Sequence, residues 1–209
     1  MGYAVNEVFH SIQGEGFNSG TSAVFCRFSG CNLWSGREAS RGKGCSAWCD
    51  TEFRSFTMYD LKDLSKKCSR VRGDSDTDLL VCTGGEPLLQ LDDDLVNVFH
   101  DKGFRVAVET NGTVVPTPKG IDWVTVSPKG HSSFKLLWGN ELKLIWPQEG
   151  IEDPSEYLYR QGFEHFFLQP LDTGETDGLK RNTDICIEYV KKNPVWRLSL
   201  QTHKWMGIR

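Results

Sequence analysis

Leu79-Leu80-Val81-Cys82-Thr83-Gly84-Gly85-Glu86-Pro87 joins a short apolar run to a glycine-rich polar segment. The run Leu79–Cys82 has the length and composition of a buried strand. Glycines let a backbone approach a ligand closely, and backbone carbonyls together with the Glu86 carboxylate can accept hydrogen bonds from a ligand ammonium group. Taken alone, Gly-Gly-Glu-Pro is equally compatible with an ordinary turn, but its pairing with the cysteines described below favours a binding loop.

Six further runs predict strands of the same kind, namely Ala23–Phe28, Arg105–Glu109, Trp123–Val126, Glu141–Ile145, Phe166–Gln169 and Arg197–Gln201. Unusual polar residues follow most of them, namely Cys31, Thr110-Asn111-Gly112, Ser127-Pro128-Lys129, Gln169-Pro170-Leu171-Asp172 and Thr202-His203-Lys204. Polar chemistry at the carboxyl ends of successive strands is typical of barrel enzymes and of open parallel sheets. There are too few strand–helix units for a full eightfold barrel. We therefore predict an α/β fold: a partial, open TIM-type barrel of about six parallel strands, forming one domain over residues 1–209.

Helical patterns lie between the strand runs. The predicted helices are Met58–Val71 with Thr57 as its cap, Leu88–Lys102 stopped by Gly103, a helix from Asp153-Pro154 to Gly162, and Asp184–Lys192 before Pro194. Their number is smaller than in a full barrel, which agrees with the open fold.

Charge and hydropathy exclude some classes of protein. A formal net charge of −4 argues against a general nucleic-acid binder. No apolar run reaches the roughly 18 residues that a membrane span needs, and the segment Met1–Glu7 lacks the pattern of a secretory signal. We therefore expect a cytoplasmic protein that binds neither membranes nor nucleic acid.

Seven cysteines are present, and three of them lie in one stretch of the chain. Clustered cysteines in a cytosolic chain indicate metal binding or catalysis rather than disulfides. The other four, which lie in apolar or amphipathic stretches, are interpreted as buried packing residues, namely Cys26, Cys68, Cys82 and Cys186.

Cys31, Cys45 and Cys49 are candidate ligands of an iron–sulfur cluster, because thiolates are the ligands that iron–sulfur clusters use. Thirteen residues separate Cys31 from Cys45, and three separate Cys45 from Cys49. The spacing leaves open whether Cys45 or the neighbouring Ser46 would serve, although sulfur is the softer ligand. A structural zinc site is the alternative, but zinc would want a fourth ligand, usually in Cys-x2–4-Cys pairs, and no histidine lies at a suitable spacing.

The chain resembles the 7-carboxy-7-deazaguanine synthase family, which belongs to the radical S-adenosylmethionine (SAM) superfamily. The segments that carry the resemblance are Asn6–Phe9, Gln13–Gly16, Arg27–Cys31, Gly44–Thr51, Thr83–Pro87, Glu109–Gly112, Val124–Lys129, Gln169-Pro170 and Arg197–Lys204. Gly-Gly-Glu-Pro marks the superfamily only, whereas Gln-Gly-Glu-Gly near the start and Gln-Thr-His-Lys near the end are far more specific. The superfamily fingerprint is Cys-x3-Cys-x2-Cys, and this chain departs from it in both gaps. The resemblance implies a radical SAM domain with an extended cluster-binding loop at about 31–49.

The resemblance also implies a reaction. The substrate would be 6-carboxy-5,6,7,8-tetrahydropterin and the product 7-carboxy-7-deazaguanine, formed by hydrogen abstraction at C6 and ring contraction with loss of ammonia, in queuosine and 7-deazapurine biosynthesis. The implied cofactors are a 4Fe–4S cluster, SAM and Mg²⁺, the implied electron donor is of the flavodoxin type, and the family is typically homodimeric. A radical SAM activase of a glycyl-radical enzyme is a second possibility, but it leaves the family-specific ends of the chain unexplained.

Site residues carried over from the family fall into four groups. The expected cluster ligands are Cys31, Cys45 and Cys49, and the expected Mg²⁺ ligand is Thr51. The expected SAM contacts are Trp48, Asp50, Gly85, Glu86, Ser127, Pro128, Lys129, Gln169, Pro170, Leu171 and Asp172. The expected substrate contacts are Ile12, Gln13, Gly14, Glu15, Arg27, Thr83, His203 and the terminal carboxylate of Arg209.

The residues themselves support two of these assignments. Arg27 ends an apolar strand, where a lone cation is costly. A substrate carboxylate would offer it a bidentate partner, and an internal ion pair is the alternative. Glu15 lies in a glycine-flanked loop and could accept from the guanidine-like edge of a pterin, although the loop could also be only a tight turn.

Overall fold

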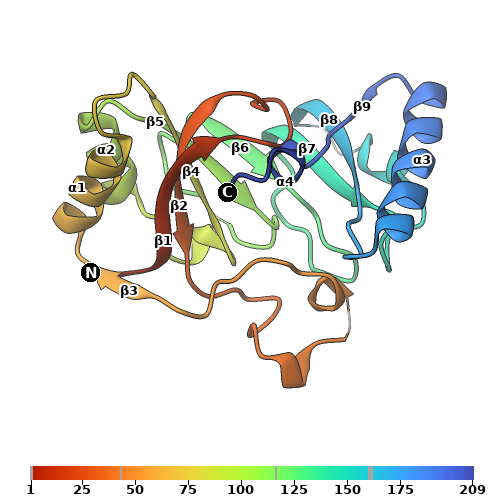
Figure 1. Ribbon diagram of the computed structural model, residues 1–209, viewed down its shortest axis with the longest axis horizontal. Helices are drawn as coiled ribbons and strands as arrows, with labels where there is room; N and C mark the ends of the chain where they lie inside the picture. Colours follow the sequence, from red (N-terminus) through yellow and green to blue (C-terminus); the bar gives the residue numbers. More distant parts are fainter. Residues whose placement is uncertain (1, 43, 116, 160–161) are drawn as a thin grey trace.

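The computed structural model describes residues 2–42, 44–115, 117–159 and 162–209. Within these ranges nine strands form one sheet in the order β3-β1-β2-β4-β5-β6-β7-β8-β9 (Figure 1). The strands are β1 Tyr3–Ile12, β2 Ser22–Phe28, β3 Thr57–Tyr59, β4 Leu79–Gly84, β5 Arg105–Thr110, β6 Trp123–Val126, β7 Gly139–Trp146, β8 Phe163–Pro170 and β9 Trp196–Leu198. The edge strands β3 and β9 are not neighbours, so the sheet is open, which confirms the predicted fold class.

Seven strands, β2 and β4 to β9, run parallel to their neighbours, where about six were predicted. Six of the seven runs identified in the sequence lie within strands, and the seventh, Arg197–Gln201, overlaps β9 only at Arg197 and Leu198. The sequence missed β1 and β3, and β1 pairs antiparallel with both β2 and β3. In β1 the polar residues Asn6, Glu7, His10 and Ser11 interrupt the apolar pattern of a buried strand, and Glu7 lines a cavity.

The helices are α1 Leu61–Arg72, α2 Asp93–Asp101, α3 Thr176–Lys192 and the short α4 Thr202–Met206. Helix α1 begins later than predicted, since Thr57 belongs to β3 and the side chain of Asp60 caps the helix by accepting from the Asp63 amide at 2.8 Å. Helix α2 also begins later, because Pro87–Leu89 forms a separate 3-10 turn and Asp92 is the cap.

Two other helix predictions were inaccurate. The expected helix after Asp153 is a single 3-10 turn, Pro154–Tyr157, and residues 160 and 161 of it lie outside the described residues. Helix α3 begins eight residues before the predicted Asp184. Helix α4 was not predicted as a helix. No helix among the described residues is long and apolar enough to cross a membrane.

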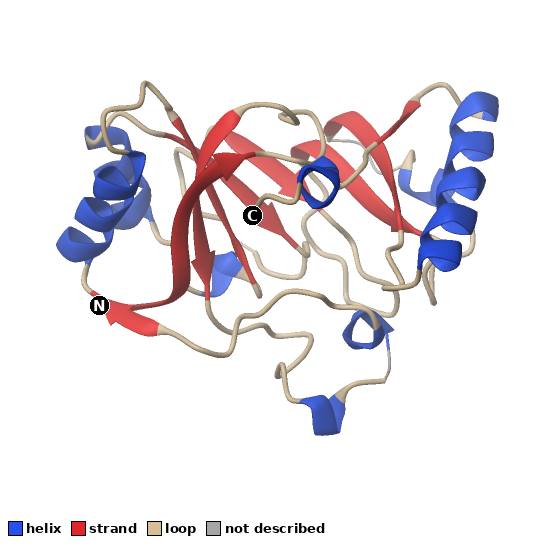
Figure 2. Ribbon diagram, viewed as in Figure 1, coloured by secondary structure: helices blue, strands red, loops and turns tan. Residues whose placement is uncertain are grey.

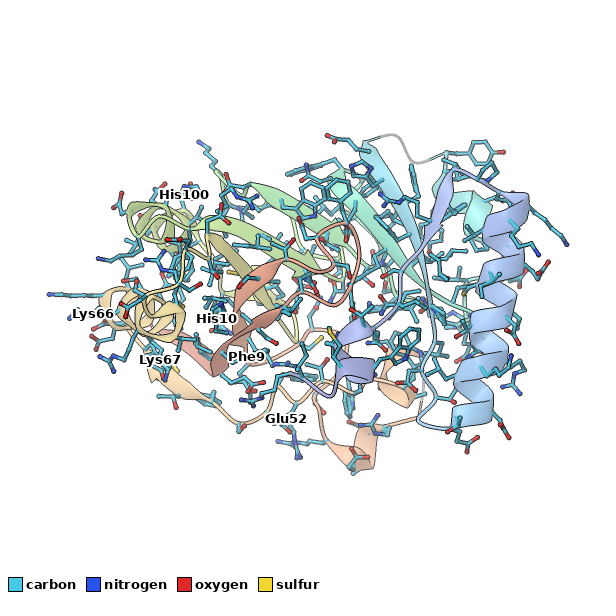
Figure 3. All side chains as sticks on the ribbon, turned by 45° about the horizontal axis from the view of Figure 1, so that its top comes forward. Phe9, His10, Glu52, Lys66, Lys67 and His100 are labelled. Carbon is cyan, nitrogen blue, oxygen red and sulfur yellow. The ribbon has the colours of Figure 1, made fainter. Side chains whose placement is uncertain are left out.

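Helices cover the convex face of the sheet, with α1 and α2 at one end and α3 at the other (Figure 2). Figure 3 shows Lys66 and Lys67 on α1 and His100 on α2 at the end opposite α3. The main core lies between the sheet and helices α1 and α2, and it includes Val24, Leu80 and Val106, each with no exposed surface.

The concave face of the sheet is apolar at one end of the strands and polar at their carboxyl ends. Small or aliphatic side chains fill one end of it, namely Ala23, Leu79, Val81 and Ala107. Because side chains alternate between the two faces of a strand, Arg27, Thr83, Glu109 and Lys143 follow on the same face nearer the carboxyl ends. The segments 29–42 and 44–56 lie across those carboxyl ends (Figure 1). The fold therefore gathers the polar side chains in one place.

Candidate active site

Three cysteine thiols line one cavity at the carboxyl end of the sheet. This cysteine cavity has a volume of about 190 Å³, and Cys31, Cys45 and Cys49 share its wall with the loop after β4. Burial raises the pKa of Cys45 and of Cys49, and the nearby Cys31 raises both further. The structure therefore brings together the three predicted cluster ligands despite the long gap between the first two.

Arg41 folds the long insertion back onto the cysteine segment. Its Nη1 donates to the carbonyl oxygens of Ser46 at 2.8 Å and of Cys49 at 3.1 Å. The guanidinium lies 4.4 Å from the centre of the Trp34 ring and is paired with Glu38. These contacts hold the turn that carries the last two cysteines.

The structure separates Cys45 from its neighbour Ser46. Cys45 lines the cysteine cavity, whereas Ser46 is not part of its described wall. The Ser46 hydroxyl accepts from the Gly42 amide at 3.3 Å within the insertion. Cys45 is therefore the better placed of the two to bind a cluster.

The arrangement of the thiols fits an iron–sulfur cluster better than a single ion. Among the described residues, no three His, Cys, Asp or Glu side chains gather closely enough to hold one metal ion. The ligands of a zinc site all surround one ion, whereas the thiolates of a 4Fe–4S cluster bind different iron atoms at the corners of a cube and so lie farther apart. Three thiols spread around one cavity match the second case.

The loop after β4 passes unusually close to the end of β2. Gly84 has a φ of +127°, and a Cβ there would lie 2.2 Å from the Phe28 carbonyl oxygen. A Cβ on Gly85 would lie 2.0 Å from the carbonyl oxygen of Gly30. Both glycines line the cysteine cavity, so their absent side chains let the backbone face it directly beside Cys31.

The Glu86 carboxylate is buried among protein donors. Its side chain is 0% exposed and is not part of the described wall of either main cavity. The carboxylate accepts from the amides of Leu88 and Asn111 and from the Thr110 hydroxyl, at 2.8 to 3.0 Å. Burial nevertheless raises its pKa. The carboxylate therefore ties the loop to β5, and the backbone of the two glycines is what faces the cavity.

The other predicted SAM contacts divide between the cavity wall and its surroundings. Those that line the cysteine cavity are Trp48, Asp50, Gly85, Ser127, Lys129 and Gln169. Pro170 and Asp172 line a small neighbouring cavity beside α4. Pro128 and Leu171 are not among the described lining residues of either cavity. The assignment of these residues to SAM stays a prediction.

All eight predicted substrate contacts line a second cavity, of about 350 Å³, on the other side of the same site. They are Ile12, Gln13, Gly14, Glu15, Arg27, Thr83, His203 and Arg209. They come from both ends of the chain, because the Gly14 carbonyl accepts from the amide and the hydroxyl of Thr202, each at 3.1 Å. This arginine cavity therefore joins the first and last segments of the sequence.

Two guanidinium groups flank one carboxylate in the arginine cavity. Arg27 Nε lies 3.1 Å from the Glu7 carboxylate, and the Arg209 guanidinium contacts the same carboxylate. Both guanidinium groups also lie over the Phe9 ring, which Figure 3 shows on β1. The internal ion pair considered for Arg27 therefore exists, and it faces the cavity. Ser11 donates to the main-chain oxygen of Arg209, which holds the end of the chain in place.

The two cavities have a wall in common. Six residues line both, namely Glu15, Asp50, Thr51, Thr83, Glu109 and Gln201. Thr51, the predicted Mg²⁺ ligand, is one of them. Ligands in the two cavities would therefore lie next to each other, because these six residues border both cavities.

The sequence did not identify Lys143, Glu109 and Gln201 as site residues. Glu109 and Gln201 lie inside segments that carried the family resemblance, so their signal was present but unused. Lys143 lies between Leu142 and Leu144 in an apolar run, and a lone lysine in a buried strand is unusual. That contrast was the available signal for Lys143.

Known proteins resemble the chain over its whole length, although no family model matches it. It is 45% identical to the 7-carboxy-7-deazaguanine synthase of Caulobacter vibrioides and 46% identical to that of Bradyrhizobium diazoefficiens, with 100% of each chain covered. The chain belongs to the 7-carboxy-7-deazaguanine synthase family. The crystal structure of QueE from Escherichia coli is similar with a TM-score of 0.72 and 29% identity, over 96% of this chain and 94% of that one.

Membership of the 7-carboxy-7-deazaguanine synthase family makes the chain a lyase of the radical SAM superfamily, with a 4Fe–4S cluster and SAM as its cofactors. The two cavities are therefore the candidate sites of a synthase of this family. The cysteine cavity suits the cofactors, and the arginine cavity suits a carboxylated substrate.

One lysine links helix α4 of this synthase-family chain to two of the predicted SAM contacts. Lys204 Nζ donates to Asp50 at 2.7 Å and to Asp172 at 2.8 Å. The hydrogen bond from Lys204 lowers the pKa of Asp172. Since Asp50 and Asp172 are both predicted SAM contacts, Lys204 would hold two parts of the SAM site together.

Replacing Lys204 by methionine is expected to raise the KM for SAM several-fold. The change leaves Asp50 and Asp172 without their common partner, while partly exposed ion pairs contribute only about 0–1 kcal/mol to folding, so the melting temperature should change little. Lys180→Met is the matched control, because it removes an exposed ion pair with Asp184 on α3. An unchanged KM for SAM in Lys204→Met would contradict the link.

Proposed function

We propose that the chain converts 6-carboxy-5,6,7,8-tetrahydropterin to 7-carboxy-7-deazaguanine with loss of ammonia, in 7-deazapurine biosynthesis. The observation that carries the proposal is the common wall between a cavity lined by three cysteines and a cavity lined by Arg27. A radical reaction of this kind needs the cofactor and the substrate next to each other. The family relatives named above support the same reaction.

The cysteine cavity would hold the cofactors. Cys31, Cys45 and Cys49 would bind the 4Fe–4S cluster, which leaves one iron without a protein ligand, and the backbone at Gly84 and Gly85 would accept from the amino group of SAM. When bound, the cluster and SAM supply hydrogen-atom abstraction from the substrate. Burial lowers the pKa of Lys129, whose amine donates to the Ser127 hydroxyl in this wall.

The arginine cavity would bind and orient the substrate. The Arg27 guanidinium would pair with the substrate carboxylate and exchange its present partner Glu7 for it. Glu15 and Glu109 would accept hydrogen bonds from the N–H groups at the guanidine-like edge of the pterin. His203 and the C-terminal Arg209 would close the cavity over the ligand.

Further parts of the proposal concern partners and organisation. Thr51 would contribute an oxygen to Mg²⁺, a hard cation that binds few protein ligands, and its place in the common wall supports this role. We further propose that the chain works as a single domain over residues 1–209, as a cytoplasmic homodimer reduced by a flavodoxin-type donor.

The direct test is turnover. Anaerobically reconstituted protein is mixed with reductant, SAM, Mg²⁺ and 6-carboxy-5,6,7,8-tetrahydropterin, and the products are analysed by mass spectrometry. We expect 7-carboxy-7-deazaguanine together with released ammonia. Protein with an intact cluster that cleaves SAM but leaves the pterin unchanged would contradict the proposal.

Replacing Arg27 by lysine is expected to raise the KM for the pterin by about 10- to 100-fold. Lysine keeps the charge but loses the planar fork, and charged hydrogen bonds contribute about 1.5–3 kcal/mol. The visible absorbance of the cluster should not change. The matched control is Arg105→Lys, since Arg105 makes a similar contact with Asp78, with Nε and oxygen 2.7 Å apart, away from the site. A KM within twofold of wild type in Arg27→Lys would argue against carboxylate binding there.

A further inference from the structure

A buried lysine lies at the centre of the site. Lys143 is 3% exposed and projects from the concave face of β7, while Leu142 and Leu144 pack on the convex side of the same strand. Its Nζ pairs closely with Glu15 and lies 3.8 Å from Oε1 of Glu109. Removing a charge from water is costly unless the charge is paired, so the two carboxylates account for the burial of this lysine.

The two carboxylates are also held by neutral donors. Gln201 Nε2 donates to Glu15 at 2.8 Å, and Gln13 Nε2 donates to Glu109 at 2.9 Å. The Glu15 amide in turn donates to the Gln13 side chain at 3.1 Å. Lys143, Glu15, Gln13 and Glu109 therefore form a closed ring of contacts, and Gln201 is attached to it through Glu15. We call these five residues the lysine ring. Its members come from the first loop, β5, β7 and the segment before α4.

Within the lysine ring, Lys143 and the carboxylates each stabilise the ionised form of the other. Burial alone would raise the pKa of Glu15, but Lys143 lowers it to about 2. Burial alone would lower the pKa of Lys143, but Glu109 and Glu15 outweigh it and raise the pKa. The carboxylate of Glu141 on the same strand adds to this effect. Glu15 thus stays ionised at neutral pH because of its lysine partner.

The remaining charged groups near the ring are few. Lys129 lies in the loop after β6, and its positive charge opposes that of Lys143. His203 on α4 lowers the pKa of Glu15, as Lys143 does. Neither forms a hydrogen bond with Glu15 among the described contacts. Among the described contacts, Lys143 is therefore the cation that pairs with both carboxylates.

The place of the ring indicates what it serves. Glu15 and Glu109 both belong to the common wall of the two cavities. We propose that Lys143 is a positioning residue of this site: it orients the carboxylates of Glu15 and Glu109 toward a ligand edge that carries several N–H donors, such as the guanidine-like edge of a pterin. The inference rests on the proposed function, because that function supplies a substrate with such an edge.

The ring explains how the site could select its ligand. Each carboxylate oxygen has two lone pairs, and the protein donors found here leave capacity for further hydrogen bonds. A ligand with N–H groups would satisfy that capacity, whereas a ligand that presents acceptors would face two negative charges. A ring that only stabilised the fold would not need charges, because a buried ion pair is often no more stabilising than its apolar replacement. An apolar side chain in place of Lys143 and amides in place of the carboxylates would then do as well.

The test measures ligand binding rather than turnover. The reconstituted protein, without reductant, is titrated with 6-carboxypterin by calorimetry between pH 6 and pH 9. Wild-type affinity should vary little, because Glu15 is ionised throughout. Lys143→Met should bind at least tenfold more weakly at pH 6, and its affinity should rise with pH, because Glu15 without its cation has a higher pKa and must lose its proton to accept. Affinity within twofold of wild type at every pH would overturn the proposal.

A second pair of variants covers the case in which Lys143→Met does not fold. Glu15→Gln with Lys143→Met removes one charge of each sign, so it should fold more stably than Lys143→Met. It should still bind 6-carboxypterin more weakly than Glu15→Gln alone, because Glu109 has lost its orienting cation. Equal affinities of these two variants would overturn the inference. Wild-type protein that binds no 6-carboxypterin would instead overturn the proposed function.

Discussion

Replacing Cys45 by alanine is expected to abolish cluster binding and all turnover. Cys45 is one of three thiols in the cysteine cavity, and a cluster held by two protein thiolates would lose iron. The reconstituted variant should be colourless, with little bound iron and no charge-transfer absorbance. Iron and sulfide analysis together with the visible spectrum measure this directly, without relying on activity.

Ser46→Ala is the matched control for this prediction. Its hydroxyl accepts from the Gly42 amide and is not part of the described cavity wall, so this variant should keep its colour and its iron content. The two variants together decide between neighbouring residues. A brown Cys45→Ala protein with a colourless Ser46→Ala protein would move the ligand to the serine position.

Replacing Gly85 by alanine is expected to destabilise the protein by about 2–3 kcal/mol, the cost of overpacking a tight site, and to prevent cluster binding. The new Cβ would lie 2.0 Å from the Gly30 carbonyl oxygen and 3.0 Å from the Cβ of Cys31. The backbone that carries the first cysteine would have to move. Chemical denaturation and iron content measure the two effects.

Gly20→Ala separates this clash from the ordinary cost of losing a glycine. Gly20 has a φ of +90° with open space around its missing side chain, so alanine there should cost about 1 kcal/mol through backbone strain alone. That variant should bind its cluster normally. A Gly85→Ala protein with a normal cluster would show that the loop can move without disturbing Cys31.

The sequence predicted the strands well, and for a clear reason. Buried parallel strands are apolar on both faces for most of their length, and runs such as Leu79–Cys82 stand out. The antiparallel β1 carries several polar residues, one of which, Glu7, lines a cavity, and these weaken that signal. The boundaries of α1 and α2 were displaced because Asp60 and Asp92, rather than the preceding residues, accept from the first free amides.

Site residues were predictable where a motif carried them and not where only contacts reveal them. The three cysteines and six of the eight predicted substrate contacts lie in segments that carry the family resemblance, while Ile12 and Arg209 lie outside them. The structure gathers each set around one cavity. The Glu86 carboxylate turns inward to three protein donors, and its predicted contact with SAM stays a prediction. No local pattern shows which way a side chain turns in a loop.

By itself, the sequence determined the chemistry of this protein: three thiols, a glycine loop after a strand, and the family to which the chain belongs. Only the tertiary structure decided how these parts meet. It placed Cys45 rather than Ser46 on the cavity, joined the two ends of the chain, and buried Lys143 between Glu15 and Glu109. The physical reason is that some of these contacts join residues far apart in the sequence: Glu15 and Lys143 are 128 positions apart. Such residues meet only because the open sheet brings the ends of its strands together.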